Sequence, residues 1–279
     1  MSHRIADGCR YVFMDVGANR GVHVRYLLEP SKFPRSRYHS TYFAPLFGAQ
    51  AQHDPTVCSI LFEPNMVHAQ AHKDLIRKFN TSRIHSIMAA AAATSSDHVV
   101  MYDHRGDNKH AHWTFGARRP SWRPVNVTAV DLAEFVATQV VGRRVPEPSY
   151  AGAPPPAVIM KVDVEGDELV LFERLLSRGV LCDINVITYE YHEYLQGRVR
   201  SPFSPSFTVD GQSYEAHEAL WDVLLSHQQP GDEDPHKEVV FARLRSTWAK
   251  RNRTKESTSW TRCPRTRFVA RDEEEYLAA

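Results

Sequence analysis

The sequence predicts an α/β fold with a doubly wound, mainly parallel sheet and helices on both of its faces. Three observations support this prediction. Short apolar runs recur along the chain, and stretches with helical spacing of apolar residues separate them. The apolar runs contain few polar residues, as is typical of strands buried on both faces. Several of these runs end in an acidic residue that is followed by a turn.

The elements follow one another in a regular order. The expected strands are 11–15, 59–63, 83–92, 98–102, 125–128, 157–163 and 185–190. The expected helices are 21–28, 66–79, 132–140, 168–177, 214–226 and 237–244. Continuous apolar runs bounded by turn residues indicate the strands, and apolar residues spaced three and four apart indicate the helices.

Three segments interrupt this order. Residues 30–57 carry prolines, aromatics and basic residues without a period, which predicts a surface insertion or lid. Residues 145–156 are rich in proline and predict a rigid loop. Residues 246–267 are rich in Arg, Lys, Ser and Thr, which indicates a mobile loop or a partner-binding segment. We expect one domain over 1–279, with an insertion at about 30–57 and a divergent region from about 200.

Composition narrows the class of protein. The chain has 279 residues and a formal net charge of +1, which gives no general attraction to nucleic acid or to anionic membranes. No apolar run approaches the roughly 20 residues of a membrane helix, and the first residues lack the apolar core of a signal peptide. We therefore expect a cytoplasmic protein with no membrane partner.

The cysteines and the glycosylation motifs give no strong indication of function. The cysteines lie far apart without a CxxC pair, which predicts reduced thiols rather than a zinc site or a disulfide framework. They are Cys9, Cys58, Cys182 and Cys263. The chain has three N-x-S/T motifs, which carry little weight without a secretion signal. They begin at Asn80, Asn126 and Asn252.

The first chemical motif is "DVGANRG", residues 15–21. Ligands of open α/β sheets bind at the carboxyl ends of the strands, where Asp15 is expected. Gly17 permits a tight turn and a close approach of the backbone, and Asn19 tolerates a left-handed conformation. Gly21 lets the next helix pack closely. A plain strand-to-helix turn is the alternative interpretation.

The spacing of this motif bears on the kind of ligand. A dinucleotide-binding turn has the pattern G-x-G-x-x-G and places a pyrophosphate on a helix N-terminus. Here the pattern is D-x-G-x-N-x-G. A carboxylate beside the turn repels a pyrophosphate and suits a cation. S-adenosylmethionine carries an ammonium and a sulfonium and no phosphate, so the pattern favours it.

A second acid ends the next predicted strand, in "ILFEPN". An acid at this place, here Glu63, typically accepts hydrogen bonds from ribose hydroxyls. Pro64 ends the strand, and Asn65 can cap the following helix. A solvated carboxylate at a strand end is the alternative interpretation.

The third motif is "KVDVEGDE", residues 161–168. With "DVGANRG" and "FEPN" (62–65), it makes the chain resemble the FkbM family of S-adenosylmethionine-dependent methyltransferases. "YEYH" (189–192) and "VTAVDLAEF" (127–135) are weaker matches. The resemblance implies a Rossmann-like class I methyltransferase fold. It does not extend past about residue 200, and the family usually has a shorter connection before "FEPN".

The resemblance implies transfer of a methyl group from S-adenosylmethionine to a hydroxyl of a sugar, a glycan or a small metabolite. The cofactor-binding residues it implies are Asp15, Gly17, Ala18, Asn19, Gly21, Glu63, Pro64 and Asn65. The catalytic candidates are Asp163, Glu165, Glu190 and His192. We favour Asp163 or His192 as the general base, with Glu165 and Glu190 orienting the acceptor or the loop. Lys161 is expected to pair with the strand-end acids.

Several alternatives stay open. No metal is predicted, although Asp163 and Glu190 could hold a divalent ion that binds acceptor hydroxyls. Loop aromatics in and beside the basic stretch 105–124 could stack on adenine or on a sugar, namely Tyr102, Trp113, Phe115 and Trp122. An RNA-directed methyltransferase could use the basic segment 246–267 on phosphates. A non-catalytic S-adenosylmethionine-binding module is a further alternative, whereas the glycine spacing disfavours an NAD-linked oxidoreductase. The oligomeric state is not predicted.

Overall fold

The computed structural model describes residues 3–79, 83–103 and 123–190, and the backbones of strands 206–209, 212–215 and 267–271. Several sequence predictions therefore lie outside the described residues. They are His192, Trp113, Phe115, Trp122, helix 237–244, residues 216–226 and nearly all of 246–267. Within the described part of the chain, no helix has the length and apolar character needed to cross a membrane.

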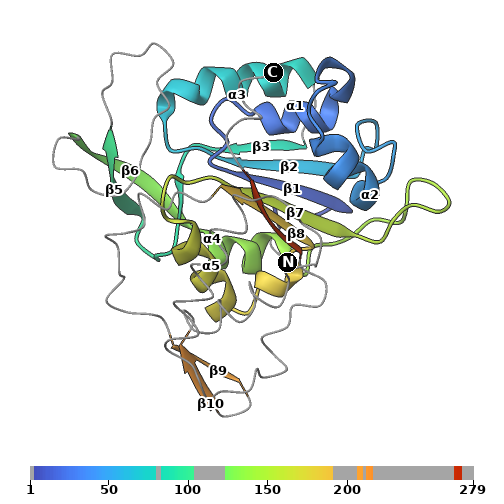
Figure 1. Ribbon diagram of the computed structural model, residues 1–279. Helices are drawn as coiled ribbons and strands as arrows, with labels where there is room; N and C mark the ends of the chain where they lie inside the picture. The colour runs from blue at the N-terminus through green and yellow to red at the C-terminus, as the bar shows by residue number, and fades with distance from the viewer. Residues whose placement is uncertain are drawn as a thin grey trace.

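The main sheet has six strands in the order β11-β8-β7-β1-β2-β3 (Figure 1). Their bounds are β1 Tyr11–Val16, β2 Val57–Phe62, β3 Ile84–Ile87, β7 Ala157–Val162, β8 Val186–Glu190 and β11 Arg267–Arg271. Every neighbouring pair is parallel. From β1 the chain first builds one side of the sheet and then the other, so the strand order reverses between β1 and β7. The predicted parallel, doubly wound sheet is confirmed.

Helices cover both faces of this sheet. Figure 1 shows α1 (Val22–Leu28) and α3 (Ala69–Phe79) on one side, and α4 (Leu132–Phe135) and α5 (Glu168–Ser177) on the other. Alternate residues of β1 divide between the two cores because strand side chains alternate between faces. Val12, Met14 and Val16 pack with α4 and α5, whereas Tyr11 and Phe13 pack with α1 and α3.

The segment 30–57 is not the surface insertion or lid that the sequence predicts. Its backbone forms short helical turns at Pro30–Lys32, His39–Phe43 and α2 (Ala44–Phe47). Four of its aromatic side chains are buried in the same core as α1 and α3. They are Tyr38, Tyr42, Phe43 and Phe47. The spacing of the aromatics hides this role because a π turn at His39–Phe43 runs directly into α2, so the residues do not follow the regular helical period.

Two smaller sheets complete the described fold. The first has the order β4-β6-β5, with bounds β4 Ala90–Ala92, β5 His98–Asp103 and β6 Arg123–Asp131. The second is the hairpin of β9 (Ser206–Val209) and β10 (Gln212–Glu215). The helix predicted from residue 214 is therefore wrong at its start. Its first residues belong to a strand, and the Asp210-Gly211 pair between β9 and β10 is a typical hairpin signal.

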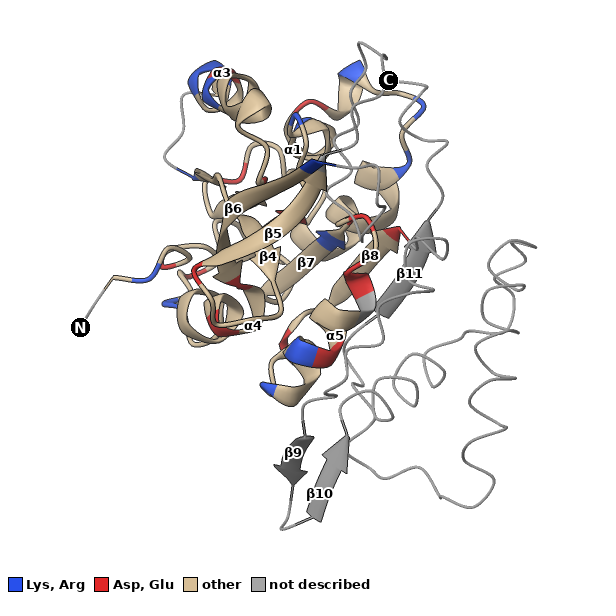
Figure 2. Cartoon of the chain, turned by 90° about the vertical axis from the view of Figure 1, so that its left-hand side faces the viewer, with Lys and Arg blue, Asp and Glu red and all other residues tan. Residues whose placement is uncertain are grey.

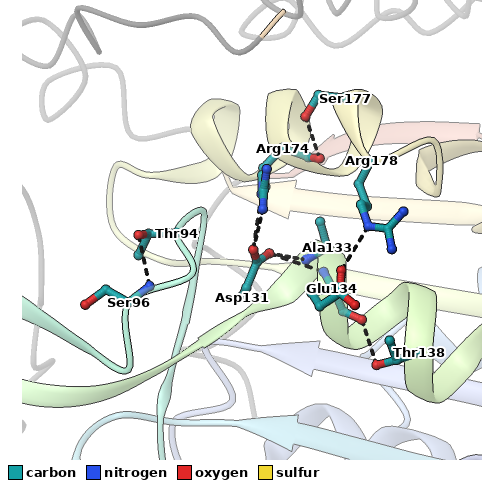
Figure 3. A network of polar contacts seen from close by, with 9 residues as sticks. All are labelled: Thr94, Ser96, Asp131, Ala133, Glu134, Thr138, Arg174, Ser177 and Arg178. Atoms are coloured by element: carbon teal, nitrogen blue, oxygen red, sulfur yellow. Dashed lines mark hydrogen bonds and ion pairs between the residues drawn. The ribbon is translucent and has the colours of Figure 1, made fainter. Parts of the chain in front are cut away.

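A polar network fastens α5 to α4 (Figure 3). Asp131 caps α4 by accepting hydrogen bonds from the backbone amides of Ala133 and Glu134. Its other oxygen accepts hydrogen bonds from Arg174 of α5, the shorter of them 2.6 Å. Arg178, which follows the last residue of α5, forms a second ion pair with Glu134 of α4. These contacts hold α5 in place directly after the third motif.

The expectation of reduced thiols is wrong. Cys9 and Cys58 form a disulfide, with their Cα atoms 5.7 Å apart, and Cys182 is also disulfide-bonded. Cys9 lies just before β1, and Cys58 is the second residue of the neighbouring β2. The separation of 49 residues in sequence conceals this proximity, because only the strand pairing brings the two together.

Candidate functional site

The candidate site lies where the carboxyl ends of β1 and β7 meet, at the reversal of strand order. In open α/β sheets this is the place where ligands bind. The two strand ends are joined by a hydrogen bond from the amide of Asp163 to the carbonyl of Val16 at 3.0 Å. The turn after β1 also bonds to the end of β2, through the Gly17 amide and the Phe62 carbonyl at 3.1 Å. Figure 2 shows acidic and basic residues together where β7 and β8 end.

The glycines of the turn are needed for packing within the protein. Gly17 has a φ of +78°, and a Cβ atom there would lie 1.7 Å from the carbonyl oxygen of Asp163. The close approach predicted at Gly17 is therefore an approach to the end of β7. Asn19 has a φ of +49°, which confirms its left-handed conformation. A Cβ at Gly21 would lie 2.9 Å from the side chain of Leu75 in α3, which confirms close helix packing.

Glu63 anchors this turn from the end of β2. One carboxylate oxygen accepts a hydrogen bond from the amide of Asn19 at 2.7 Å, and the other from the amide of Asn65 at 2.8 Å. Asn65 also caps the next helical turn as predicted, since its side chain accepts a hydrogen bond from the Val67 amide at 3.0 Å. Burial raises the pKa of Glu63 to about 7, although the two backbone amides oppose this shift.

His72 of α3 holds the turn from the other side, and the sequence analysis missed it. Its Nε2 lies 2.7 Å from the carbonyl oxygen of Asn19, and its Nδ1 lies 2.7 Å from the hydroxyl of Ser86. A carbonyl can only accept, so Nε2 carries the proton and donates it. Burial lowers the pKa of His72, which favours the neutral ring. Glu63 and His72 thus hold the two sides of one residue, Asn19.

Asp15 and Lys161 form a buried charged pair at the ends of β1 and β7. They are neighbours in strand register. Lys161 donates to the carbonyl of Gly17 at 2.7 Å and to Asp163 at 3.0 Å, and it lies 3.6 Å from Asp15. Its predicted role as an ion-pair partner is confirmed. Burial raises the pKa of Asp15 to about 6, with Lys161 opposing the shift. Among the described residues, neither oxygen of Asp15 has a hydrogen-bond partner.

Three residues that the sequence analysis did not select line the same face of the sheet. His23 of α1 lies 3.9 Å from Asp15, and its ring is 4.8 Å from the ring of Tyr38. The hydroxyl of Tyr38 in turn contacts the hydroxyl of Thr188 on β8. The segment 30–57 therefore reaches the site through Tyr38. The signal for this contact is not local, because it depends on how that segment folds back onto the sheet.

The predicted acceptor-side residues are only partly brought together. Asp163 is at the end of β7, and its side chain is 15% exposed, whereas that of Asp15 is fully buried. Glu165 follows in a turn with a φ of +58°. Glu168 accepts a hydrogen bond from the Gly166 amide at 3.1 Å and so fixes this turn to α5. Glu190 ends the adjacent strand β8.

Pro64 ends β2, and Ala18 is buried in the turn. Over the described ranges, no three His, Cys, Asp or Glu side chains are grouped so that they could hold a metal ion.

Comparisons with family models, with curated proteins and with solved structures found no match to this chain.

Proposed function

We propose that the protein is an S-adenosylmethionine-dependent O-methyltransferase that acts on a hydroxyl of a sugar, a glycan or a small metabolite. The observation that carries the proposal is the arrangement of Glu63. A carboxylate has about four sites that can accept hydrogen bonds. The backbone amides of Asn19 and Asn65 occupy one site on each oxygen. One further site on each oxygen suits the two hydroxyls of a ribose.

The charge around the turn supports a cationic ligand. Asp15 and Glu63 are both buried acids, and the nearby Lys161 already donates to Gly17 and Asp163. Asp15 acts on a ligand through its charge, because its side chain is fully buried and cannot touch one. The field of these acids favours a sulfonium and an ammonium over a pyrophosphate.

The chemical step is an in-line displacement. The acceptor oxygen forms a bond to the methyl carbon, the bond from carbon to sulfur breaks, and the sulfonium becomes a neutral thioether. The acceptor hydroxyl loses its proton to a base, and Asp163 is the candidate among the described residues because its side chain is partly exposed at the strand end. Alignment of oxygen, carbon and sulfur supplies much of the rate.

Binding of S-adenosylmethionine to the full chain, measured by calorimetry, tests the cofactor. Glu63→Ala should weaken binding at least tenfold, because charge-assisted hydrogen bonds are each worth about 1.5–3 kcal/mol. This variant also releases the Asn19 turn, so a 2′-deoxyribose analogue separates the two effects. The analogue should lose less affinity against the variant than against the parent. Equal losses would show that Glu63 does not contact the ribose.

An exposed arginine on the same turn provides a matched control. Arg20 is the side chain there that a pyrophosphate ligand would use. Arg20→Gln should leave S-adenosylmethionine affinity nearly unchanged. If this substitution instead abolishes binding of a dinucleotide that the parent binds, the proposal is wrong.

Turnover with labelled S-adenosylmethionine and a panel of hydroxylated acceptors then tests the reaction. Asp163→Asn should lower turnover by about 10²–10⁴-fold if Asp163 is the base. Activity should survive a strong chelator. If the chelator abolishes turnover and magnesium restores it, a metal ion and not Asp163 activates the acceptor hydroxyl.

A further inference from the structure

We propose that Asn126 is an N-glycosylation site and that the chain folds in an oxidising compartment, where this glycan is added. This location replaces the cytoplasmic one that the sequence predicts, and it does not depend on the proposed methyltransferase function. The proposal joins two observations from different parts of the molecule, the disulfides and the exposed motif Asn126-Val127-Thr128.

The disulfides indicate the compartment. Cys9 and Cys58 are each 2% exposed and joined to one another, and Cys182 is also disulfide-bonded. Disulfides persist in secretory and other oxidising compartments and are rare where glutathione keeps thiols reduced. Each bond forms when two thiols give two protons and two electrons to an oxidoreductase of that compartment, whose own disulfide becomes two thiols.

The motif lies on a strand that presents it to solvent. Along β6 the side chains alternate, so Asn126 and Thr128 lie on the exposed face while Val127 is buried. Strand β4 pairs with β6 at Ala129 to Asp131, and among the described strands only β5 pairs with β6 at Asn126. Figure 1 shows β5 and β6 projecting beyond the main sheet. A bulky glycan at Asn126 therefore does not require the fold to open.

The residue opposite Asn126 on β5 is also exposed, which supports a glycan at this place. Val100 of β5 is the strand partner of Asn126, and it is 58% exposed. Residues directly opposite on an antiparallel pair lie close enough for their side chains to interact. The first sugar on Asn126 would lie over this apolar side chain and shield it from water.

The modification is a balanced group transfer. The side-chain amide nitrogen of Asn126 forms a bond to the anomeric carbon of an oligosaccharide carried on a lipid pyrophosphate. The bond from that carbon to the pyrophosphate oxygen breaks, the lipid pyrophosphate leaves, and the amide loses one proton. Thr128 supplies the hydroxyl that defines the acceptor motif.

The first test uses the full-length protein from the cells that make it, lysed in an alkylating reagent and mapped by mass spectrometry. We expect Cys9 and Cys58 to be joined and unalkylated, and the Asn126 peptide to carry a sugar stub after endoglycosidase treatment. Alkylated Cys9 and Cys58, or an unmodified Asn126, would overturn the proposal.

The second test directs the full chain into the secretory pathway of a cultured eukaryotic cell with an added, cleavable signal sequence. Asn126→Gln and Thr128→Ala should each lower the mass of the protein by one glycan that a glycosidase can remove. This holds whether or not the other two motifs are modified. Thr128→Ser keeps the motif and should keep the glycan. If Asn126→Gln leaves the number of glycans unchanged, Asn126 is not a site.

Discussion

The two ends of strands β1 and β2 differ in kind. At the amino end, Cys9 and Cys58 close the pair covalently. At the carboxyl end, the same strands deliver Asp15 and Glu63, two buried acids whose pKa values burial raises to about 6 and about 7. The disulfide at the amino end stabilises the fold, whereas the buried acids at the carboxyl end destabilise it when they ionise.

This contrast indicates where function resides. A buried acid with a raised pKa pays a desolvation penalty whenever it ionises, and strongly perturbed acids are common at functional sites. The disulfide and the apolar core below it hold the register that keeps the two acids in place. The site can therefore carry unfavourable charges because the opposite end of the same strands is well secured.

The largest effect is expected at Gly17, where the carboxyl end is most tightly packed. Gly17→Ala would place Cβ 1.7 Å from the backbone of Asp163 and keep a left-handed conformation. We expect a loss of at least about 3 kcal/mol in the free energy of unfolding. Gly152→Ala is the matched control, since it has a φ of +80° with nothing within 4 Å, and strain alone costs about 1–2 kcal/mol. Equal losses in urea denaturation would contradict the packing argument.

The second largest effect is expected when the disulfide at the amino end of β1 and β2 is removed. Replacing both Cys9 and Cys58 with Ser should lower the free energy of unfolding by about 2–4 kcal/mol. Binding at the carboxyl end should persist wherever the variant stays folded. Reductant should destabilise the parent more than the variant in thermal melts. If both respond equally to reductant, this disulfide does not secure the strand pair.

A third prediction concerns the pH dependence that Asp15 contributes. Burial raises its pKa from 3.8 to about 6, so the folded chain holds this proton more tightly than the unfolded chain. Stability from this group therefore falls as the pH rises from about 4 to about 6, by up to about 3 kcal/mol, and is constant above that window. Asp15→Asn should remove this fall.

The comparison must use the difference between parent and variant, measured by urea denaturation across this pH range. Burial lowers the pKa of several histidines, which changes stability with pH in the opposite sense. They are His39, His68, His72 and His85. A difference that stays constant from pH 4 to pH 7 would show that Asp15 is not a strained buried acid.

The smallest effect is expected at the cap that follows Glu63. Asn65→Ala removes the side-chain acceptor of the Val67 amide and should cost about 1 kcal/mol. Asn65→Asp keeps an acceptor oxygen and should cost much less. A thermal melt of the three proteins checks the order, and an Ala variant as stable as the Asp variant would rule out the cap.

The sequence predicted what local patterns determine. The bounds of α5 match the prediction of 168–177, and the acids Asp15, Glu63 and Asp163 do lie at the ends of parallel strands. Strand periodicity and turn chemistry fix these features within a few residues of chain. The three acids lie close to one another because β1 is between β7 and β2 in the sheet.

The features that sequence reasoning missed depend on contacts between distant segments. The Cys9–Cys58 bond follows from strand pairing, and the contact of His72 with Asn19 spans 53 residues. Tyr38 reaches Thr188 across 150 residues. No periodicity in one segment reports such contacts, because each depends on how two elements pack.

The pH dependence of S-adenosylmethionine affinity tests the central claim most directly. Glu63 must be ionised to accept the ribose hydroxyls, and with a pKa of about 7 only about a tenth of it is ionised at pH 6. Affinity measured by calorimetry should therefore rise about tenfold from pH 6 to pH 8, with proton release on binding, and Glu63→Gln should remove most of this rise. Affinity that is equal at the two pH values, or lower at pH 8, in the folded parent would contradict the account.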